Sequence, residues 1–292
     1  MIRSRGEKIF DTINTTIMLL FCISIIYPIW YIVVLSFNDG MDAMRGGIYW
    51  WPRVFTIETY KTVLGASGIM TSYGVTIAKT IVGVATHVFF IGLVAYGLSK
   101  EDLRFRKIYM GLGLVTMFFN GGLIPNFLLI NKLGLLNSFW VFILPCLFNM
   151  FEMIVMMNFF KAIPKSIEES AYIDGANYLI IFFKIVLPLS MPVVATIGLW
   201  NGVWQWNDFF SGVIYINNPD LQPIQTFLYK IISQAGASQM TANLPASAMQ
   251  AKTTSESVKL ATMILTTLPI MLVYPFLQKY FVKGMMVGAT KG

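Results

Sequence analysis

A short polar stretch inside an otherwise apolar segment carries side chains suited to bind a ligand rich in hydroxyl groups. Asn201, Gln205 and Asp208 recur at i, i+4 and i+7, so a helix would place them on one face. Trp200 and Trp204 flank that face, also four residues apart. Amides and a carboxylate can hydrogen-bond to sugar hydroxyls, and an indole ring can stack on a pyranose. The alternative is that these groups hold neighbouring helices together.

A second interruption of an apolar segment lies at Asn120-Gly121-Gly122 and is followed by Pro125 and Asn126. A helix break at membrane depth is tolerated only where it faces protein or a water-filled cavity. Asn120 and Asn126 are therefore candidates for lining a translocation path. The alternative is a kink whose glycines let two helices pack closely.

The longest polar run before residue 215 spans residues 164–188 and separates two apolar segments. Ser166 and Glu169 have the spacing of a capping box, and Gly175 can supply the left-handed residue that ends a helix. We expect one short helix from Ile167 to about Asp174 and a second from Ala176 to about Lys184. This run therefore predicts a helix–turn–helix unit outside the bilayer, where a partner can dock.

Catalytic and metal chemistry find little support in the sequence. No Gly-Lys dipeptide occurs, so the chain lacks the P-loop that cradles nucleotide phosphates. His87 has no second His or Cys near it in sequence, and we expect it to hydrogen-bond to a neighbouring helix, with a proton relay as the alternative. Glu152, an isolated charge, can line a cavity or pair with a base such as Lys79 or one on a partner subunit.

The composition is that of a polytopic membrane protein. Of 292 residues, 56% are hydrophobic and 12% are charged, whereas soluble domains average about 25% charged residues. The net charge of +7 fits basic cytoplasmic loops and does not require a nucleic-acid partner. We expect a lipid bilayer around the chain, and no cofactor or metal bound to it.

Six apolar segments are long enough to span a bilayer. They cover about residues 10–36, 73–98, 107–130, 137–160, 185–214 and 258–282. We therefore divide the chain into a first span with an outer segment (1–72), a core of five spans (73–282) and a tail (283–292).

Basic residues cluster in alternate segments between these spans. The segments are residues 1–9, 99–107, 161–184 and 279–292, and they hold thirteen of the twenty-one Lys and Arg residues. The positive-inside rule places them, with both termini, in the cytoplasm. Segments 37–72 and 215–257 then lie outside, where either can receive an external protein, as can Asp208 at the outer end of its span.

The 164–188 run resembles the EAA loop of membrane subunits of ATP-binding-cassette (ABC) importers. The matching pattern is Glu169-Ser170-Ala171, then Gly175, then Ile185-x-Leu187-Pro188, with Ser170 in place of the usual alanine. Four other stretches are similar to carbohydrate-type permeases: residues 119–125, 133–138, 158–164 and 206–209. The first span and the loop after it resemble the oligosaccharide branch of that family.

The resemblance implies an all-α membrane protein with six transmembrane helices and the type I ABC importer permease fold. It implies a second homologous permease subunit, two ATPase subunits that bind Mg-ATP, an extracytoplasmic solute-binding protein and an oligosaccharide substrate. The ATPase-coupling residues it implies are Glu168, Glu169, Ser170, Ala171, Asp174 and Gly175. It also implies that the tail beyond Lys283 contacts the ATPases.

Besides a non-transporting membrane scaffold, two other functions remain open on the residues alone. One is an ABC permease for another small polar solute, against which the aromatic fifth span argues. The other is an ion-coupled secondary transporter, which needs intramembrane acidic residues for coupling. Glu152 and Asp208 are few for that role and are not paired in sequence.

Overall fold

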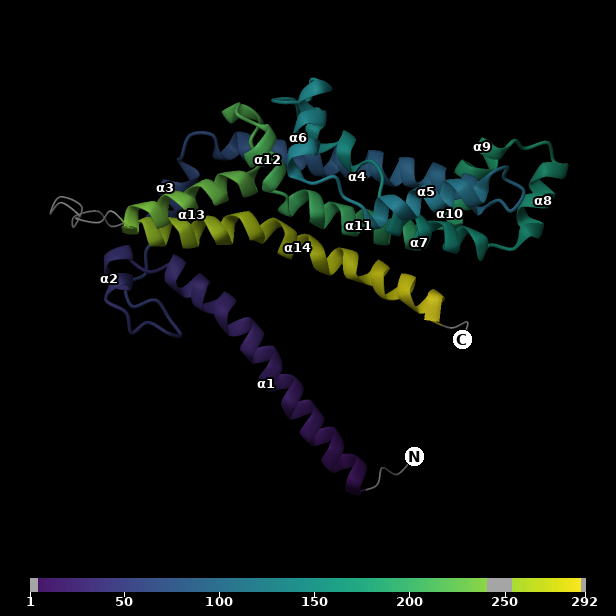
Figure 1. Cartoon of the computed structure of the whole chain (residues 1–292). Coiled ribbons are helices and arrows are strands. Elements are labelled where there is room, and N and C mark those ends of the chain that lie inside the picture. The colour runs from purple at the N-terminus through teal and green to yellow at the C-terminus, as the bar shows by residue number, and fades with distance from the viewer. Residues whose placement is uncertain (1–4, 241–253, 290–292) are drawn as a thin grey trace. The chain divides into compact units, whose positions relative to one another are not determined.

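The computed structural model describes residues 5–240 and 254–289, and within those ranges it is helical, without strands (Figure 1). Asn38 and Phe55 form an isolated antiparallel bridge in the first outer segment. The helices before residue 135 are α1 (Arg5–Ser36), α2 (Gly40–Met44), α3 (Glu58–Leu64), α4 (Ile69–Ser99), α5 (Arg106–Phe118) and α6 (Leu123–Lys132). Those after it are η1 (Phe139–Phe142), η2 (Leu144–Cys146), α7 (Met150–Lys161), α8 (Lys165–Ile173), α9 (Tyr178–Ile181), η3 (Phe182–Val186), α10 (Leu187–Leu189), α11 (Met191–Asn207), α12 (Phe210–Tyr215), η4 (Pro219–Leu221), α13 (Ile224–Met240) and α14 (Ser255–Ala289).

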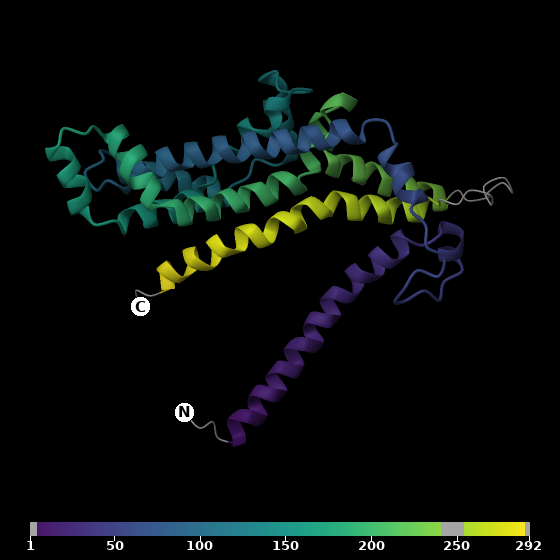
Figure 2. The same cartoon turned by 180° about the vertical axis from the view of Figure 1, so that it is seen from behind.

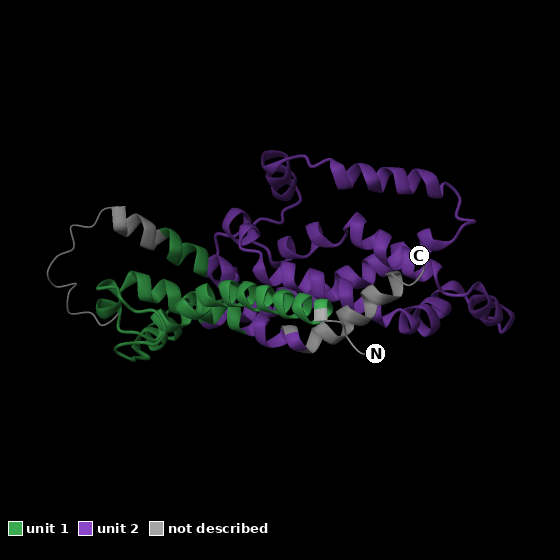
Figure 3. Cartoon of the chain, turned by 90° about the horizontal axis from the view of Figure 1, so that it is seen from below, with its two compact units in different colours: residues 1–69, 228–268 green, residues 70–227, 269–292 purple. Residues whose placement is uncertain are grey.

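The chain divides into two compact units (Figure 3). Unit 1 comprises Met1–Ile69 and Leu228–Leu268, and unit 2 comprises Met70–Phe227 and Pro269–Gly292. All the candidate site residues belong to unit 2, which contains α4 to α12. The three-part division suggested by the sequence runs in the order of the spans. The two units instead each combine segments that are far apart in the sequence but contact each other.

Six candidate spans are present in the described part of the chain. Three are single helices: Gly6–Ser36, Ile69–Ser99 and Ser255–Val273. Three are bent pairs: Arg106–Phe118 with Leu123–Lys132 (117°), Phe139–Cys146 with Met150–Lys161 (54°), and Tyr178–Leu189 with Met191–Asn207 (81°). The six apolar segments were thus located correctly, but three of them are broken.

Each break has a local cause in the sequence. Gly122, at the start of α6, has φ +88°, which only glycine adopts without strain. The Asn149 side chain accepts a hydrogen bond from the Glu152 amide and so starts α7 as a new helix. Ser190 leaves helical geometry between α10 and α11, and Pro192, which has no amide hydrogen, fits the first turn of α11.

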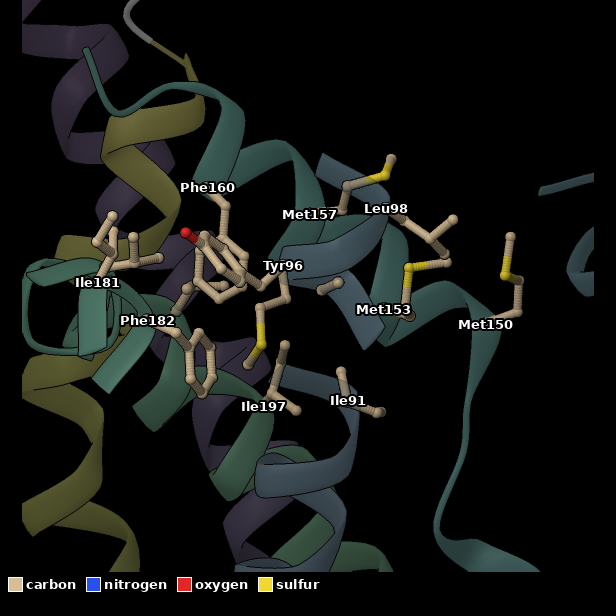
Figure 4. Close-up of a cluster of buried hydrophobic side chains, with 14 of the residues drawn as sticks. Ile91, Tyr96, Leu98, Met150, Met153, Met157, Phe160, Ile181, Phe182 and Ile197 are labelled. Atoms are coloured by element: carbon tan, nitrogen blue, oxygen red, sulfur yellow. The ribbon is translucent and has the colours of Figure 1, made fainter. Parts of the chain in front are cut away.

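The apolar core of unit 2 lies between α4, α7 and the α9–η3 segment (Figure 4). Methionines of α7 and aromatic rings from three elements fill it. The rings of Phe160 and Phe182 contact the Tyr96 ring, with centroids 6.3 and 5.3 Å away. Ala171, Ala176 and Ile181 of the 164–188 segment pack in or against this core, which therefore holds that segment in place.

Two segments expected to be loops contain helix. In residues 215–257, α13 occupies Ile224–Met240, while residues 241–253 lie outside the described part of the chain. In the tail, α14 continues to Ala289, and residues 290–292 likewise lie outside it. The expected separation of span and tail at residue 283 is therefore not visible as a helix end.

Candidate functional site

The helix–turn–helix unit predicted at 164–188 is present, and it lies beyond one end of α4 (Figures 1 and 2). Its first helix, α8, begins earlier than predicted. Pro164 is the N-cap, extended at φ −56° and ψ 128°, and no side chain caps the helix. The predicted capping box of Ser166 and Glu169 is therefore wrong, because Pro164 already sets the start and Ser166 lies inside the first turn.

Gly175 ends α8 as predicted, with φ +82°. The Gly175 amide donates to the Tyr172 carbonyl (3.0 Å), and the Ala176 amide donates to the Ala171 carbonyl (2.9 Å). These two bonds form a Schellman motif, in which the last carbonyls of the helix are satisfied by the residues after it. Ala171 and Ala176 also pack against the unit 2 core, which fixes the turn to the protein.

The second helix of the unit starts later and runs further than predicted. Asn177 caps α9 by accepting a hydrogen bond from the Ile180 amide (2.9 Å). The chain then passes without a break through the π-helical η3 and into α10. The later start follows from the cap at Asn177. Lys184 lies inside the helical run and does not end it, because the run continues through Leu189.

The two adjacent glutamates of α8 have different environments. Glu168 accepts hydrogen bonds from Lys100 Nζ and from the Tyr96 hydroxyl (3.4 Å), so it faces its own chain. Glu169 is exposed, as are Ser170 and Asp174. The Ser170 hydroxyl donates back to the Ile167 carbonyl (3.0 Å). Of the two glutamates, Glu169 is thus the one whose exposure leaves it free to meet a partner, and Asp174 is a second exposed carboxylate of the loop.

The surface of the unit is apolar as well as acidic. Ile173 is 87% exposed, and Tyr178, Leu179 and Ile180 are exposed beside the turn. Large apolar side chains outside the bilayer and without cover from their own chain mark an interaction surface. Spacing in the sequence located the unit, but gave no sign that these four residues project.

A second, exposed ion pair joins the unit to the loop after α4. Lys165 Nζ donates to Glu101 (2.8 Å), and both side chains are about three quarters exposed. The hydrogen bond and the positive charge of Lys165 lower the pKa of Glu101, and the same contact raises the pKa of Lys165.

The predicted polar face of α11 is split by burial. Asn201 and Gln205 are buried, and Gln205, at 1% exposure, donates from Nε2 to the Phe142 carbonyl (3.0 Å). Gly83 permits this approach, because a Cβ there would lie 2.6 Å from Gln205 Nε2. Within the part of the chain that the structure describes, Oδ1 of Asn201 and Oε1 of Gln205 have no hydrogen-bond partner. Helix packing therefore uses the Nε2 donor of Gln205, while the two acceptor oxygens are unpaired among the described residues.

Asp208 does not share the helical face with Asn201 and Gln205. It follows the last residue of α11 in extended geometry, with ψ 103°. Its carboxylate accepts a hydrogen bond from Lys79 Nζ (3.1 Å), and the two side chains are 6% and 0% exposed. The expectation that Asp208 shares the α11 face is therefore wrong, because α11 ends one residue earlier. Contact of Asp208 with an external protein stays a prediction, and within this chain a buried lysine holds the carboxylate.

The tryptophans lie in more open surroundings. Trp200 is half-buried and stacks on Phe151 of α7 at 5.9 Å between centroids. Trp204 is 49% exposed. These two rings are thus the more exposed part of the predicted face, and their contact with a ligand stays a prediction.

The break in the third span is as predicted, and its two asparagines contact each other. Asn120 Oδ1 accepts hydrogen bonds from the Gly122 amide (2.9 Å) and from Asn126 Nδ2 (3.4 Å). Residues 119–126 are exposed in this chain. Non-helical backbone at membrane depth needs protein or water around it, so the lining of a translocation path by Asn120 and Asn126 stays a prediction.

Sequence reasoning found His87 and Glu152 separately and did not pair them with each other. His87 Nε2 lies 2.5 Å from Glu152 Oε2, and Nδ1 lies 2.6 Å from the Cys146 carbonyl. The expectation of a histidine bonded to a neighbouring helix is confirmed. The suggested pair of Glu152 with Lys79 is wrong, since Lys79 binds Asp208 and is too far along α4 to serve both.

A groove of about 740 Å³ lies between α4, α11 and the start of the unit 2 part of α14. Its lining is almost wholly apolar and includes Val84, Gly198, Gly202 and Trp206. Asn201, Trp204 and Gln205 are not part of it. An apolar groove of this kind suits lipid or a partner helix and not a sugar. The groove and the predicted polar face are therefore different surfaces.

The chain is similar in sequence to known transport permeases. The chain is 38% identical to the polygalacturonan/rhamnogalacturonan transport system permease protein YtcP of Bacillus subtilis, covering 98% of this chain and 99% of that protein. It is 37% identical to Protein LplC of Bacillus subtilis, covering 100% and 98%.

A solved structure is similar over nearly the whole chain. It is the crystal structure of a bacterial ABC transporter involved in the import of the acidic polysaccharide alginate. The TM-score is 0.86 at 33% identity, with 96% of this chain and 99% of that chain covered. The type I ABC permease fold predicted from the sequence is thereby confirmed. Residues 1–287 match a family described as the binding-protein-dependent transport system inner membrane component, and the chain belongs to that family.

Proposed function

We propose that this chain is one of two homologous permease subunits of an ATP-driven importer for oligosaccharides. Two ATPase subunits supply the energy, and an external solute-binding protein delivers the substrate. This chain forms part of the translocation path and couples it to the ATPases. Membership in a binding-protein-dependent family supports the general role, and the similarity to saccharide permeases supports the cargo.

The observation that carries the proposal is the geometry of α8 and its turn. A rigid Schellman end at Gly175 presents Glu169, Ile173 and Leu179 outward from a unit that is packed on the core from behind. An exposed carboxylate beside apolar side chains fits a groove with basic or N–H-rich walls. We assign that groove to the ATPase, which binds the Mg-ATP that this chain has no P-loop to hold.

The translocation path is assigned to two exposed features of unit 2. One is the break at Asn120 and Asn126, which needs water or protein around it. The other is the aromatic surface of Trp200 and Trp204. The asparagines offer amide hydrogen bonds to a sugar, and the tryptophans offer flat apolar rings on which it can stack.

The cargo we propose is an acidic oligosaccharide. One relative is named for polygalacturonan and rhamnogalacturonan, and the similar structure is of an importer for the acidic polysaccharide alginate. Both kinds of polymer carry uronic acids. We carry this class, and no single sugar, over to this chain.

The orientation we propose puts both termini and α8 in the cytoplasm. Basic residues near the span ends support it through the positive-inside rule. Single cysteines in a background without Cys22 and Cys146 test it with a membrane-impermeant reagent. A cysteine at Ser166 should stay unlabelled in intact cells, whereas one at Tyr49 should react. Labelling of Ser166→Cys from outside would overturn the orientation and the ATPase assignment together.

Function is tested by reconstituting the complex with its binding protein in lipid vesicles. We expect ATP hydrolysis to rise, and labelled galacturonate oligomers to enter, when the loaded binding protein is outside. Neutral oligomers of the same length are the matched control for charge. Stimulation of ATP hydrolysis by neutral oligomers only would refute the proposal of an acidic cargo. No stimulation by any saccharide would refute the importer assignment.

A further inference from the structure

Glu168 and Glu169 are adjacent on α8, yet their carboxylates serve different surfaces. Glu169 is exposed toward any partner of the loop. Glu168 is directed toward Lys100, just beyond the end of α4, and its side chain is only 17% exposed. A carboxylate committed to its own chain is not available to an ATPase. Its role must therefore lie within the permease.

Lys100 and Tyr96 hold Glu168 from two sides. Lys100 Nζ donates to Glu168 Oε2 and lies 4.2 Å from the centre of the Tyr96 ring. The Tyr96 hydroxyl donates to the same carboxylate oxygen at 3.4 Å. An ammonium group over an aromatic face is attracted by the ring, and the attraction grows when water is excluded. The three side chains thus form one compact polar cluster.

The cluster rests on the rigid core of unit 2. The Tyr96 ring packs against Phe160 at the end of α7 and Phe182 of η3, as Figure 4 shows. A tyrosine held by two other rings cannot easily rotate away from the carboxylate it donates to. Glu168 is therefore tied to the apolar core of unit 2.

The exposed pair Lys165–Glu101 joins the same two elements and offers an internal comparison. Its side chains are 77% and 73% exposed, whereas those of Lys100 and Glu168 are 21% and 17% exposed. Exposed ion pairs contribute little to stability, because water screens them and two flexible side chains must be ordered. The partly buried pair is the one able to transmit force.

We infer that Glu168 is a positioning residue that clamps α8 to the end of α4, so that movement of the coupling loop is passed directly to α4. The inference rests on the proposed function. It goes beyond it, because it names the route of coupling inside the permease. A clamp of this kind leaves ATPase docking to Glu169 and the apolar residues around it.

The route continues along α4, a helix without a break from Ile69 to Ser99. From Tyr96 back to His87 and Lys79 is about 14 and 26 Å at 1.5 Å per residue. His87 contacts Glu152 of α7, and Lys79 binds Asp208 at the end of α11. One rigid helix therefore carries polar ties to α8, α7 and the end of α11 in turn.

The test uses the complete transporter with its binding protein in lipid vesicles. Glu168→Gln and Lys100→Met should leave the amount of ATPase that co-purifies unchanged but lower substrate-stimulated uptake several-fold. The ratio of substrate transported to ATP hydrolysed should fall, which a simple loss of folded protein would not cause. Glu101→Gln with Lys165→Met is the matched control and should behave as the parent.

The exchanged pair Glu168→Lys with Lys100→Glu separates an internal clamp from an ATPase contact. If the carboxylate and ammonium act on each other, the exchange should restore at least half of the parental coupling ratio. If Glu168 instead binds the ATPase, the reversed charge should abolish co-purification. Failure of the exchange to restore coupling, or parental coupling in both single variants, overturns the inference.

A distance measurement keeps the inference testable even if saccharide transport is not observed. Spin labels at Ser166→Cys on α8 and Asp102→Cys after α4 report on the clamp in a background lacking Cys22 and Cys146. With the clamp intact, we expect one narrow distance distribution that stays the same with and without Mg-ATP. In Lys100→Met it should broaden. A distribution as narrow in Lys100→Met as in the parent would refute the clamp, whatever the cargo proves to be.

Discussion

The coupling loop at 164–188 and the polar face at 200–208 were both visible in the sequence, yet only the loop has the form expected. In the loop, Gly175 ends the first helix with the predicted left-handed geometry. On α11, Gln205 is buried against Phe142, and Asp208 lies beyond the helix end in a pair with Lys79. The loop depends on local backbone chemistry, whereas the face depends on which helices happen to surround it.

That difference explains what a single sequence can and cannot fix here. A left-handed residue is determined within a few positions, because only glycine adopts such φ values cheaply. A helical periodicity shows which residues share a face, but it does not show whether that face meets lipid, protein or water. The predictions below test each side of this contrast, beginning with the largest effect.

The buried pair of Lys79 and Asp208 should be the most sensitive feature of the α11 region. Lys79→Met or Asp208→Asn alone leaves a charge buried without its partner. Removing one member of a buried pair costs about 3–5 kcal/mol. Thermal unfolding of the purified complex should show a large drop for either single variant.

The double variant Lys79→Met with Asp208→Asn is the control for this pair. It removes both charges, and the new amide oxygen can still accept the hydrogen bond that the Ser211 amide now gives to Asp208 (3.0 Å). We expect the double variant to be more stable than either single variant. Additive losses would show that the two charges do not interact.

The turn at Gly175 should be the most sensitive point of the coupling loop. Proline is fixed near φ −65° and cannot adopt the +82° seen here. A residue forced into such a region costs of the order of 1–3 kcal/mol. Gly175→Pro should stay in the membrane but lose co-purifying ATPase, and Glu169→Lys should do the same by reversing the exposed charge.

Gly175→Asn tests whether geometry is the cause. Asparagine adopts left-handed geometry more readily than other non-glycine residues. We expect it to retain most of the bound ATPase. Equal loss in Gly175→Pro and Gly175→Asn would instead indicate that the side chain itself is excluded from the interface.

The fold could largely be predicted because its signals are long or local. Six apolar runs located the candidate spans, and Asn120-Gly121-Gly122 located the sharpest break. The start of α8 was missed because the sequence offers two possible starts, one after Pro164 and one at the capping-box spacing of Ser166 and Glu169. The helix uses the first of them. The ties of Lys100 to Glu168 and of His87 to Glu152 were out of reach, because each joins residues more than sixty positions apart.

A smaller effect should separate the two halves of the predicted sugar-binding face. Trp204 is exposed, so Trp204→Ala should weaken uptake a few-fold while the complex unfolds at the parental temperature. Gln205 is buried, so Gln205→Leu should lower the unfolding temperature, because the Phe142 carbonyl loses its donor. One neutral hydrogen bond contributes about 0.5–1.5 kcal/mol. If neither variant changes uptake, the face only packs helices.

The smallest effect should come from the exposed pair Glu101–Lys165 and its pH dependence. The folded-state pKa of Glu101 is lowered by Lys165, so its contribution to stability is present above about pH 4 and is lost as pH falls further. The pKa of Lys165 is raised, so its contribution is full below about pH 10 and is lost as pH rises further. Any difference in unfolding temperature between the parent and Glu101→Gln should therefore be small and flat between about pH 5 and pH 9.

Salt and acid sharpen this last prediction. Because both side chains are exposed, the difference should shrink in about 1 M salt, where the screening length is about 3 Å. It should also vanish as pH falls through the carboxylate range, since Glu101 is then neutral in both states. The difference in coupling between the parent and Glu168→Gln should persist in the same high salt, because the parent's Lys100–Glu168 ion pair is partly buried. A defect that disappears in salt would make the two pairs equivalent and remove the distinction on which the clamp depends.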